Sequence, residues 1–210
     1  MARPIVYGAR YSAYVRIVLL TLIEKGVAHD VVEVDVFAEG GPPAEHLVRH
    51  PFGKIPAFAH DGVQLYEAAA IARYVDEAFP GPALQPADPR VRARMAQAIG
   101  LLDSYAYRPW VWGLYVERVS KPKRGLAADE AAIAAALAKG ETAAAALEAI
   151  LGTSPFLAGE TISLADLHAA PMLGYLVKAP DGAALLARHP RLERWWRDLS
   201  ERPSVAEICT

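Results

Sequence analysis

The residues Phe52-Gly53-Lys54-Ile55-Pro56-Ala57-Phe58 carry the most structural information in this sequence. A residue before proline favours extended backbone, and an X-Pro bond adopts the cis form at modest cost. The stretch continues into a short apolar strand, 57–59, and Asp61-Gly62 then favours a hairpin to a second strand, 63–65. A strand that opens on proline leaves the backbone N–H and C=O of Ile55 unpaired, and an extended peptide can pair with such an edge. The sequence therefore predicts a small peptide-like ligand that is bound backbone to backbone.

The rest of the N-terminal third alternates between strand and helix patterns. Residues 13–25 have apolar side chains at helical spacing, and Gly26 follows where a helix C-cap is expected. Polar and apolar residues alternate from 30 to 36, as they do in a half-buried strand. The expected order is strand 5–7, helix 13–25, strand 30–36, a loop with room for one helix, strands 57–59 and 63–65, and helix 67–79.

Composition and charge narrow the class of protein. The chain has 210 residues and a net charge of −2, so it can bury a substantial core, and we expect neither nucleic acid nor an anionic membrane as a partner. Its one cysteine, Cys209, excludes a disulfide framework and is typical of a reducing, cytoplasmic compartment. The first residues lead directly into a strand, so we expect no signal peptide. The most apolar stretch, 131–151, is interrupted by Lys139-Gly140-Glu141, so we expect no membrane span.

A cluster of proline and glycine from 80 to 89 marks a domain boundary, after which the patterns are helical. Asp88-Pro89 is typical of a helix N-terminus, and the alanine-rich run 127–151 favours helix. Ser163 and Asp166 are spaced as in a capping box, a feature that serves folding. The expected parts are a domain over 1–80, a linker over 81–90 and an all-helical domain over 91–210.

Further motifs along nearly the whole chain are informative in their order and spacing. They are Tyr7-Gly8-Ala9-Arg10-Tyr11-Ser12, Glu24-Lys25-Gly26, 50–58, 66–74, Phe156-Leu157-Ala158-Gly159, 161–166, His189-Pro190-Arg191-Leu192, Trp195-Trp196 and Arg202-Pro203-Ser204. Together they resemble the cytosolic glutathione S-transferase family, in its serine-type, phi- or bacterial-like branches. The resemblance implies an α+β thioredoxin-like N-terminal domain followed by an all-α helical-bundle C-terminal domain. It also implies a detoxification enzyme that activates glutathione, its substrate, as a thiolate for attack on a hydrophobic electrophile.

The expected chemistry lies where the first strand meets the first helix. A helix N-terminus offers unpaired N–H groups and a positive dipole end, which favour a thiolate over a thiol. Ser12 lies at this turn, and its hydroxyl can donate a hydrogen bond to a ligand sulfur. The resemblance implies that Ser12 is the catalytic donor, which would lower the thiol pKa by about one to two units. Two alternatives stay open: Ser12 is only a helix N-cap, or Tyr7 is the thiolate donor, as a strand-end tyrosine is in other branches of the family.

The resemblance also implies which residues bind glutathione. They are Lys54, Ile55, Pro56, Glu67 and Ala68. Ile55 is expected to pair its backbone with the cysteinyl unit, before a cis proline, and Lys54 either reaches the glycine carboxylate or stays a solvated loop lysine. Glu67 is expected to face the amino group of the γ-glutamyl end. The family has serine where this chain has Ala68, and the loop 40–44 lacks the basic residues of serine-type relatives, so we expect affinity to fall about tenfold or more.

The resemblance extends to quaternary structure and to the second substrate. In several branches an aromatic residue four positions before the cis proline inserts into the partner subunit, so Phe52 implies a homodimer; the alternative is an ordinary buried aromatic residue. The residues expected to line the electrophile pocket are Arg10, Tyr11, Tyr107 and Arg108. Pro109 is expected to kink or break the helix that carries the last two.

Other chemistries have little support in the sequence. His46 and His50 are four residues apart but lack a third ligand nearby, so we expect no metal site. The chain has no glycine-rich nucleotide loop and no cysteine pair for dithiol exchange. Two alternatives to a transferase stay open: a non-catalytic interaction protein on the same fold, which Ala68 favours, and a glutathione-dependent isomerase, dehalogenase or peroxidase.

Overall fold

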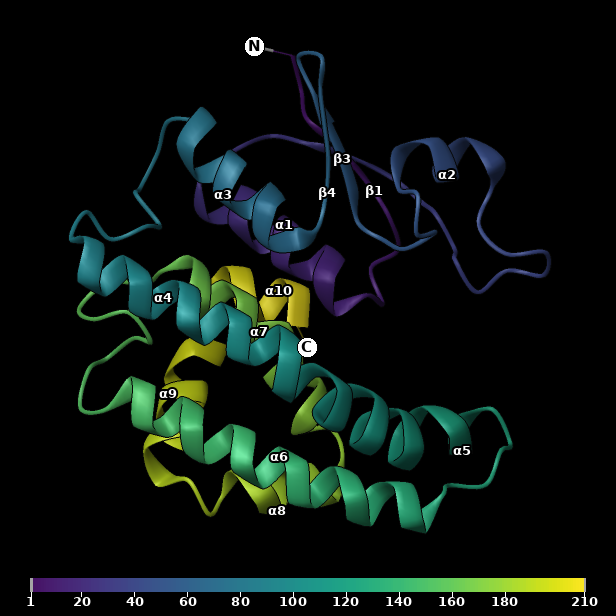
Figure 1. Cartoon of the computed structure of the whole chain (residues 1–210), viewed down its shortest axis with the longest axis vertical. Helices are drawn as coiled ribbons and strands as arrows, with labels where there is room; N and C mark the ends of the chain where they lie inside the picture. The colour runs from purple at the N-terminus through teal and green to yellow at the C-terminus, as the bar shows by residue number, and fades with distance from the viewer. Residues whose placement is uncertain (1, 210) are drawn as a thin grey trace. The chain divides into compact units, whose positions relative to one another are not determined.

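The computed structural model describes residues 2–209 and divides into two compact units between Leu84 and Gln85 (Figure 1). The first unit contains the following elements in chain order: β1 (Ile5–Tyr7), α1 (Ala13–Glu24), β2 (Asp30–Val32), α2 (Ala44–Arg49), β3 (Ala57–His60), β4 (Val63–Tyr66) and α3 (Ala68–Ala78). These positions confirm the expected order of strands and helices, and the loop before β3 contains the one short helix, α2, for which the sequence left room.

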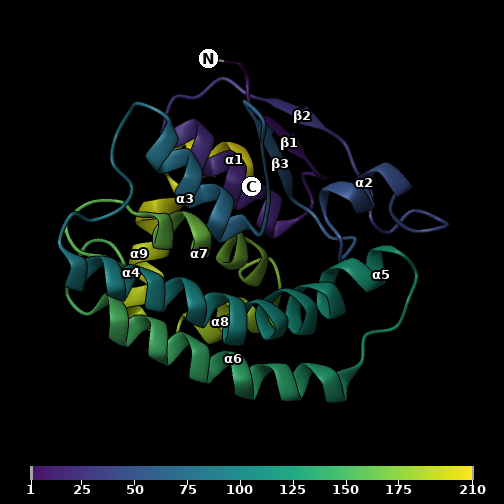
Figure 2. The same cartoon turned by 45° about the horizontal axis from the view of Figure 1, so that its top comes forward.

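The four strands form one mixed sheet in the order β2-β1-β3-β4. β1 is parallel to β2 and antiparallel to β3, which forms a hairpin with β4. α1 and α3 pack against each other on one face of the sheet, with α2 on the opposite side of the strands (Figures 1 and 2). This arrangement follows from the sequence of α1, whose residues Val15, Ile17, Val18, Leu20 and Leu22 are all fully buried.

The second strand is shorter than expected, because it ends at Val32 and does not extend to residue 36. The carboxylate of Asp35 accepts the backbone N–H of Phe37 at 2.9 Å and the hydroxyl of Tyr11 at 2.8 Å. An aspartate that bonds the backbone two residues on forms a turn, which ends the extended conformation.

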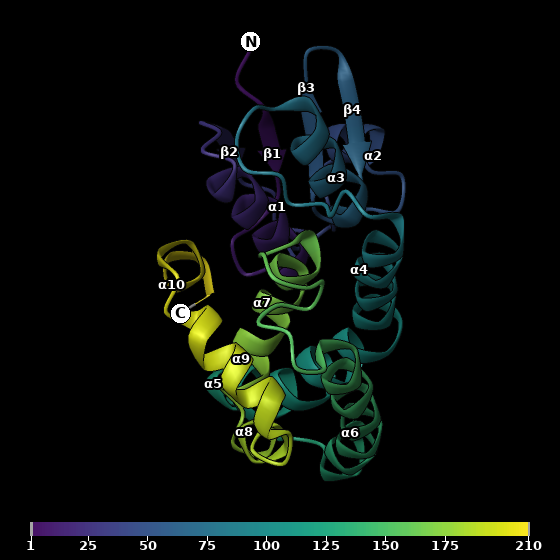
Figure 3. The ribbon, with the colours of Figure 1, turned by 90° about the vertical axis from the view of Figure 1, so that its left-hand side faces the viewer.

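From residue 85 to residue 209, the second unit is built from helices, without a strand. Its elements are α4 (Pro89–Leu101), the π-helical segments η1 (Leu102–Ala106) and η2 (Arg108–Ser120), α5 (Lys121–Lys123), α6 (Glu130–Leu151), α7 (Leu164–Leu176), α8 (Pro180–Leu186), α9 (Pro190–Ser200) and α10 (Pro203–Cys209). Every residue of α7 is buried, and this helix lies among the other helices of the unit (Figure 3). Ser163 and Asp166 form the expected capping box at the start of α7.

Pro109 does not break the helix that contains it. Helical backbone continues from Pro89 to Lys123, and the expectation of a break was wrong. Proline lacks the N–H that an α-helical bond would need, and around Pro109 the chain is π-helical, with hydrogen bonds five residues apart. Tyr107 and Trp112, which are five residues apart, therefore lie next to each other, and Trp112 Nε1 donates to the Tyr107 hydroxyl at 3.0 Å.

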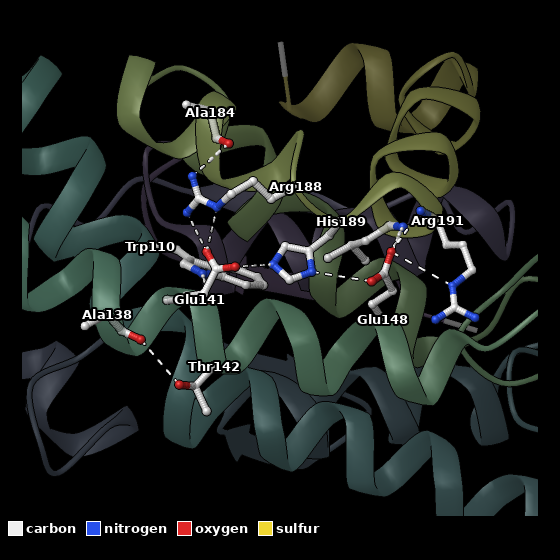
Figure 4. Close-up of polar contacts among 11 residues, drawn as sticks. Trp110, Ala138, Glu141, Thr142, Glu148, Ala184, Arg188, His189 and Arg191 are labelled. Atoms are coloured by element: carbon white, nitrogen blue, oxygen red, sulfur yellow. Dashed lines mark hydrogen bonds and ion pairs between the residues drawn. The ribbon is translucent and has the colours of Figure 1, made fainter.

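A polar network joins α6 to the corner between α8 and α9 (Figure 4). His189 Nε2 lies 3.0 Å from Glu141 Oε1, and His189 Nδ1 lies 3.4 Å from Glu148 Oε2. Glu141 also accepts hydrogen bonds from the guanidinium of Arg188. Glu148 Oε1 accepts the backbone N–H of Arg191 at 2.9 Å, so it caps α9, whose own N-cap residue, His189, makes no side-chain capping bond.

Candidate active site

Ser12 is the N-cap of α1, with extended backbone angles. Its Oγ accepts the backbone N–H of Val15 at 3.4 Å, and its own N–H donates to the carbonyl oxygen of Ala9 at 3.0 Å. The hydroxyl hydrogen has no acceptor among residues 2–209, and the side chain is half-buried. Since a hydroxyl accepts with its lone pairs and donates with its hydrogen, capping the helix leaves Ser12 able to donate to a ligand atom.

The strand register places three predicted site segments at the same end of the sheet. Tyr7 lies opposite Ala57, so Gly8 and the turn to Ser12 follow next to Pro56. Ala57 in turn lies opposite Tyr66, so Glu67 also follows next to Pro56. The sheet therefore brings together residues that are more than fifty positions apart in the sequence.

Gly8 lies where a side chain would collide with its neighbours. A Cβ atom on Gly8 would lie 2.5 Å from Val15 Cγ2 and 3.2 Å from Ile55 Cβ. Real Cβ atoms do not come as close as the first of these distances, so no other residue fits at position 8 without displacing α1 or Ile55. The absence of a side chain at position 8 therefore lets Val15 of α1 and the side chain of Ile55 approach the Gly8 backbone closely.

The Ile55-Pro56 peptide bond is cis, as expected. Neither the N–H nor the C=O of Ile55 has a partner among residues 2–209, and Ile55 is only 8% exposed. Buried backbone groups are rarely left without partners, so these two are suited to bind an extended ligand. The Lys54 side chain is exposed, while its carbonyl oxygen is bound by the ring of His46 at 2.7 Å.

Glu67 has φ 72° and ψ 113°, a conformation that residues other than glycine rarely adopt. Such strained residues are concentrated at ligand sites. Glu67 is exposed and occupies the N-cap of α3 without a side-chain capping bond, and Ala68, the first residue of the helix, is 4% exposed. The N-terminal N–H groups of α3 therefore receive no side-chain cap from Glu67 and can bind an anionic group.

An aromatic cluster, formed by His46, His50, Phe52 and Tyr66, lies beside these segments. The ring of His50 is 4.8 Å from that of Tyr66, and Phe52 contacts both in edge-on geometry. Burial lowers the pKa of His50, which is 2% exposed. Phe52 is 70% exposed, so the alternative that it is an ordinary buried aromatic residue was wrong.

Tyr7 and Tyr11 both have neighbours that their sequence positions did not reveal. The guanidinium carbon of Arg49 lies 4.4 Å from the centre of the Tyr7 ring, a cation–π contact. The Tyr11 hydroxyl donates to Asp35, and the Tyr11 ring lies 5.8 Å from that of Phe37. Burial and the hydrogen bond to the Asp35 carboxylate raise the pKa of Tyr11, so this phenol stays protonated at neutral pH.

The remaining predicted residues have simpler surroundings. Arg10 is exposed, and its carbonyl oxygen accepts Arg16 Nε at 2.7 Å. In the second unit, burial raises the pKa of Tyr107, and Arg108 is exposed.

Across residues 2–209, no three His, Cys, Asp or Glu side chains are grouped so that they could hold a metal ion. Nor does any helix within this range have the length and apolar character that crossing a membrane requires.

The strand order, the cis proline and the N-cap serine define a thioredoxin-like unit, which is followed by an all-helical unit. Two family models match the chain: "Glutathione S-transferase, N-terminal domain" over residues 6–83 and "Glutathione S-transferase, C-terminal domain" over residues 130–198. Glutathione S-transferase F9 of Arabidopsis thaliana is 31% identical over 204 residues, which cover 96% of this chain and 94% of the relative. The chain belongs to the glutathione S-transferase family, a family of transferases.

Solved structures support the same assignment over the full length. Glutathione transferase F7 from Populus trichocarpa has a TM-score of 0.85 and 32% identity, with 99% of each chain covered. Glutathione S-transferase I from maize, in complex with an atrazine glutathione conjugate, has a TM-score of 0.85 and 28% identity, with 99% of this chain and 97% of that chain covered.

Proposed function

We propose that this chain is a serine-type glutathione S-transferase in which Ser12 stabilises the thiolate of bound glutathione for attack on a hydrophobic electrophile. The observation that carries this proposal is the hydroxyl hydrogen of Ser12, which has no acceptor among residues 2–209. This hydroxyl lies at the N-terminus of α1, and Gly8, which precedes its turn, has no room for a side chain between Val15 and Ile55. The hydrogen bond and the positive end of the helix dipole both favour the thiolate over the thiol.

Glutathione is proposed to bind as an added extended segment. Its cysteinyl unit pairs with the backbone of Ile55, Glu67 faces the γ-glutamyl amino group, and the N–H groups at Ala68 face the γ-glutamyl carboxylate. Lys54, whose side chain is exposed, is proposed to reach the glycine carboxylate. The maize relative whose structure holds a glutathione conjugate supports glutathione as the ligand.

The second substrate and the assembly belong to the same proposal. Arg10 and Tyr11 of the first unit are proposed to contact the electrophile. Tyr107 and Arg108 of the second unit are proposed to contact it as well. Phe52 is proposed to insert into a partner subunit, and its 70% exposure in the single chain supports a homodimer. The single cysteine supports a cytoplasmic location, where detoxification would take place.

The test is an ultraviolet titration of glutathione into the protein at neutral pH, in which thiolate absorbance is measured. The unmodified protein should give a saturable thiolate signal. Ser12→Ala should bind glutathione with little change in affinity, lose the thiolate signal and conjugate about ten- to hundredfold more slowly.

Tyr7→Phe is the control, and it should retain both the thiolate signal and the rate. The opposite pattern, with Ser12→Ala active and Tyr7→Phe inactive, would make Tyr7 the donor. A protein that binds no glutathione by calorimetry would instead be a non-catalytic interaction protein, the alternative that Ala68 and the uncharged loop 40–44 favour. Normal binding and activation without conjugation would favour an isomerase, dehalogenase or peroxidase at the same site.

A further inference from the structure

His46, on α2, has a hydrogen-bonding role that its position in the sequence does not reveal. The side chain is 1% exposed, and its Nε2 lies 2.7 Å from the carbonyl oxygen of Lys54. A carbonyl oxygen only accepts hydrogen bonds, so Nε2 carries a hydrogen and donates it. The other ring nitrogen, Nδ1, is buried without a partner among residues 2–209. The single polar contact that His46 makes through its ring is therefore the one to Lys54.

This contact fixes the orientation of the peptide unit between Lys54 and Ile55. The unit is planar and trans, because the only cis bond among the described residues is the next one along the chain. In a trans peptide the C=O and the N–H point in opposite directions. When His46 binds the carbonyl oxygen of Lys54, the N–H of Ile55 must point away from α2. That N–H has no partner among residues 2–209.

We propose that His46 is a positioning residue, which holds the Lys54–Ile55 peptide so that the Ile55 N–H faces the cysteinyl carbonyl of glutathione. This inference rests on the proposed function, since it takes glutathione as the ligand. His46 does not touch the ligand; it acts through the peptide that does. Without the hydrogen bond the peptide can rotate, and part of the binding free energy is then used to restore its orientation.

Three substitutions separate the hydrogen bond from the packing of the ring. His46→Gln keeps an amide N–H near the place of Nε2, whereas the shorter His46→Asn does not reach the Lys54 carbonyl. His46→Phe keeps an aromatic ring of similar size but has no donor. We expect His46→Asn and His46→Phe to raise the KM for glutathione about five- to tenfold with little change in kcat. His46→Gln should have a KM close to that of the unmodified protein. A purely structural role of the ring would give the opposite order, with Phe near normal and Gln impaired, and would overturn the proposal.

A measurement without ligand separates this proposal from the proposed function. In nuclear magnetic resonance spectra of the unliganded protein, the Ile55 amide resonance should shift in His46→Phe and stay in place in His46→Gln. Nε2 of the His46 ring should carry a hydrogen. If the protein binds no glutathione but these signals behave as described, the orientation of the peptide is supported and only the identity of the ligand is wrong. If the Ile55 amide resonance has the same position in all variants, the proposed role of His46 is overturned, whether or not glutathione binds.

Discussion

Glu148, on α6, caps the N-terminus of α9: its Oε1 accepts the backbone N–H of Arg191 at 2.9 Å and that of Leu192 at 3.4 Å (Figure 4). A capping acceptor is usually supplied by the residue before the helix, but His189 makes no such bond. We expect Glu148→Ala to lower the free energy of unfolding by about 1–2 kcal/mol, measured by urea titration at neutral pH. Glu148→Gln keeps a hydrogen-bond acceptor and should lower the free energy of unfolding by less. If the two variants lower it equally, the charge of Glu148, not capping, is the main contribution.

The same network makes stability depend on pH. Hydrogen bonds from the guanidinium of Arg188 lower the pKa of Glu141 below its usual 4.5. Burial would raise the pKa of Glu148, but hydrogen bonds from the N–H groups of Arg191 and Leu192 outweigh it and lower the pKa below 4.5. A carboxylate whose pKa is lower in the folded state stabilises the fold fully above the unfolded value, and this contribution is lost as pH falls through the folded value.

We therefore expect the stability of the protein to fall below about pH 5 more steeply than that of the double variant Glu141→Gln, Glu148→Gln. Urea unfolding at several pH values between 7 and 3.5 measures this difference. The difference in the free energy of unfolding between the two proteins should be largest near neutral pH and should shrink on acidification. A difference that does not change with pH would mean that these two carboxylates contribute through packing and not through their charge.

Local sequence signals predicted most of the first unit. The helix over 13–25 and the hairpin at Asp61-Gly62 each depend on neighbours in the chain, and both are confirmed. The cis bond before Pro56, which the family resemblance implied, is also confirmed. The capping box of Ser163 and Asp166 was predictable for the same reason, since its two residues are three positions apart.

Features that depend on distant partners were not predictable. The contact from His46 to the Lys54 carbonyl and that from Tyr11 to Asp35 arise only when the chain folds. The strand pattern of 30–36 did not reveal that Asp35 forms a turn, and nothing in the side chain of Glu67 indicates its positive φ. Candidate site residues could thus be proposed from the sequence, but the groups that contact them in the folded chain could not.

Gly8 is expected to be essential, because its neighbours cannot move. A Cβ atom at this position would lie 2.5 Å from Val15 Cγ2, and Val15 is fully buried. Gly8→Ala should therefore destabilise the protein by about 1–3 kcal/mol and also weaken glutathione binding, because Ile55 would be displaced. Gly100→Ala is the control: apart from its chain neighbours and the backbone of its own helix, no described atom lies within 4 Å of its added Cβ. Alanine also favours helix, so stability should stay equal or rise. A Gly8→Ala protein of normal stability would show that α1 shifts at little cost.

Ala68 offers a gain-of-function prediction for the same site. It is the first residue of α3 and 4% exposed, next to the strained Glu67. Ala68→Ser should add a hydroxyl that donates to the γ-glutamyl carboxylate and lower the Kd for glutathione about tenfold, as measured by calorimetry. Ala70→Ser, on the exposed side of the same helix, is the matched control and should leave the Kd unchanged. If both variants bind like the unmodified protein, the backbone N–H groups of α3 alone satisfy the carboxylate, and the alanine at position 68 has no cost for affinity.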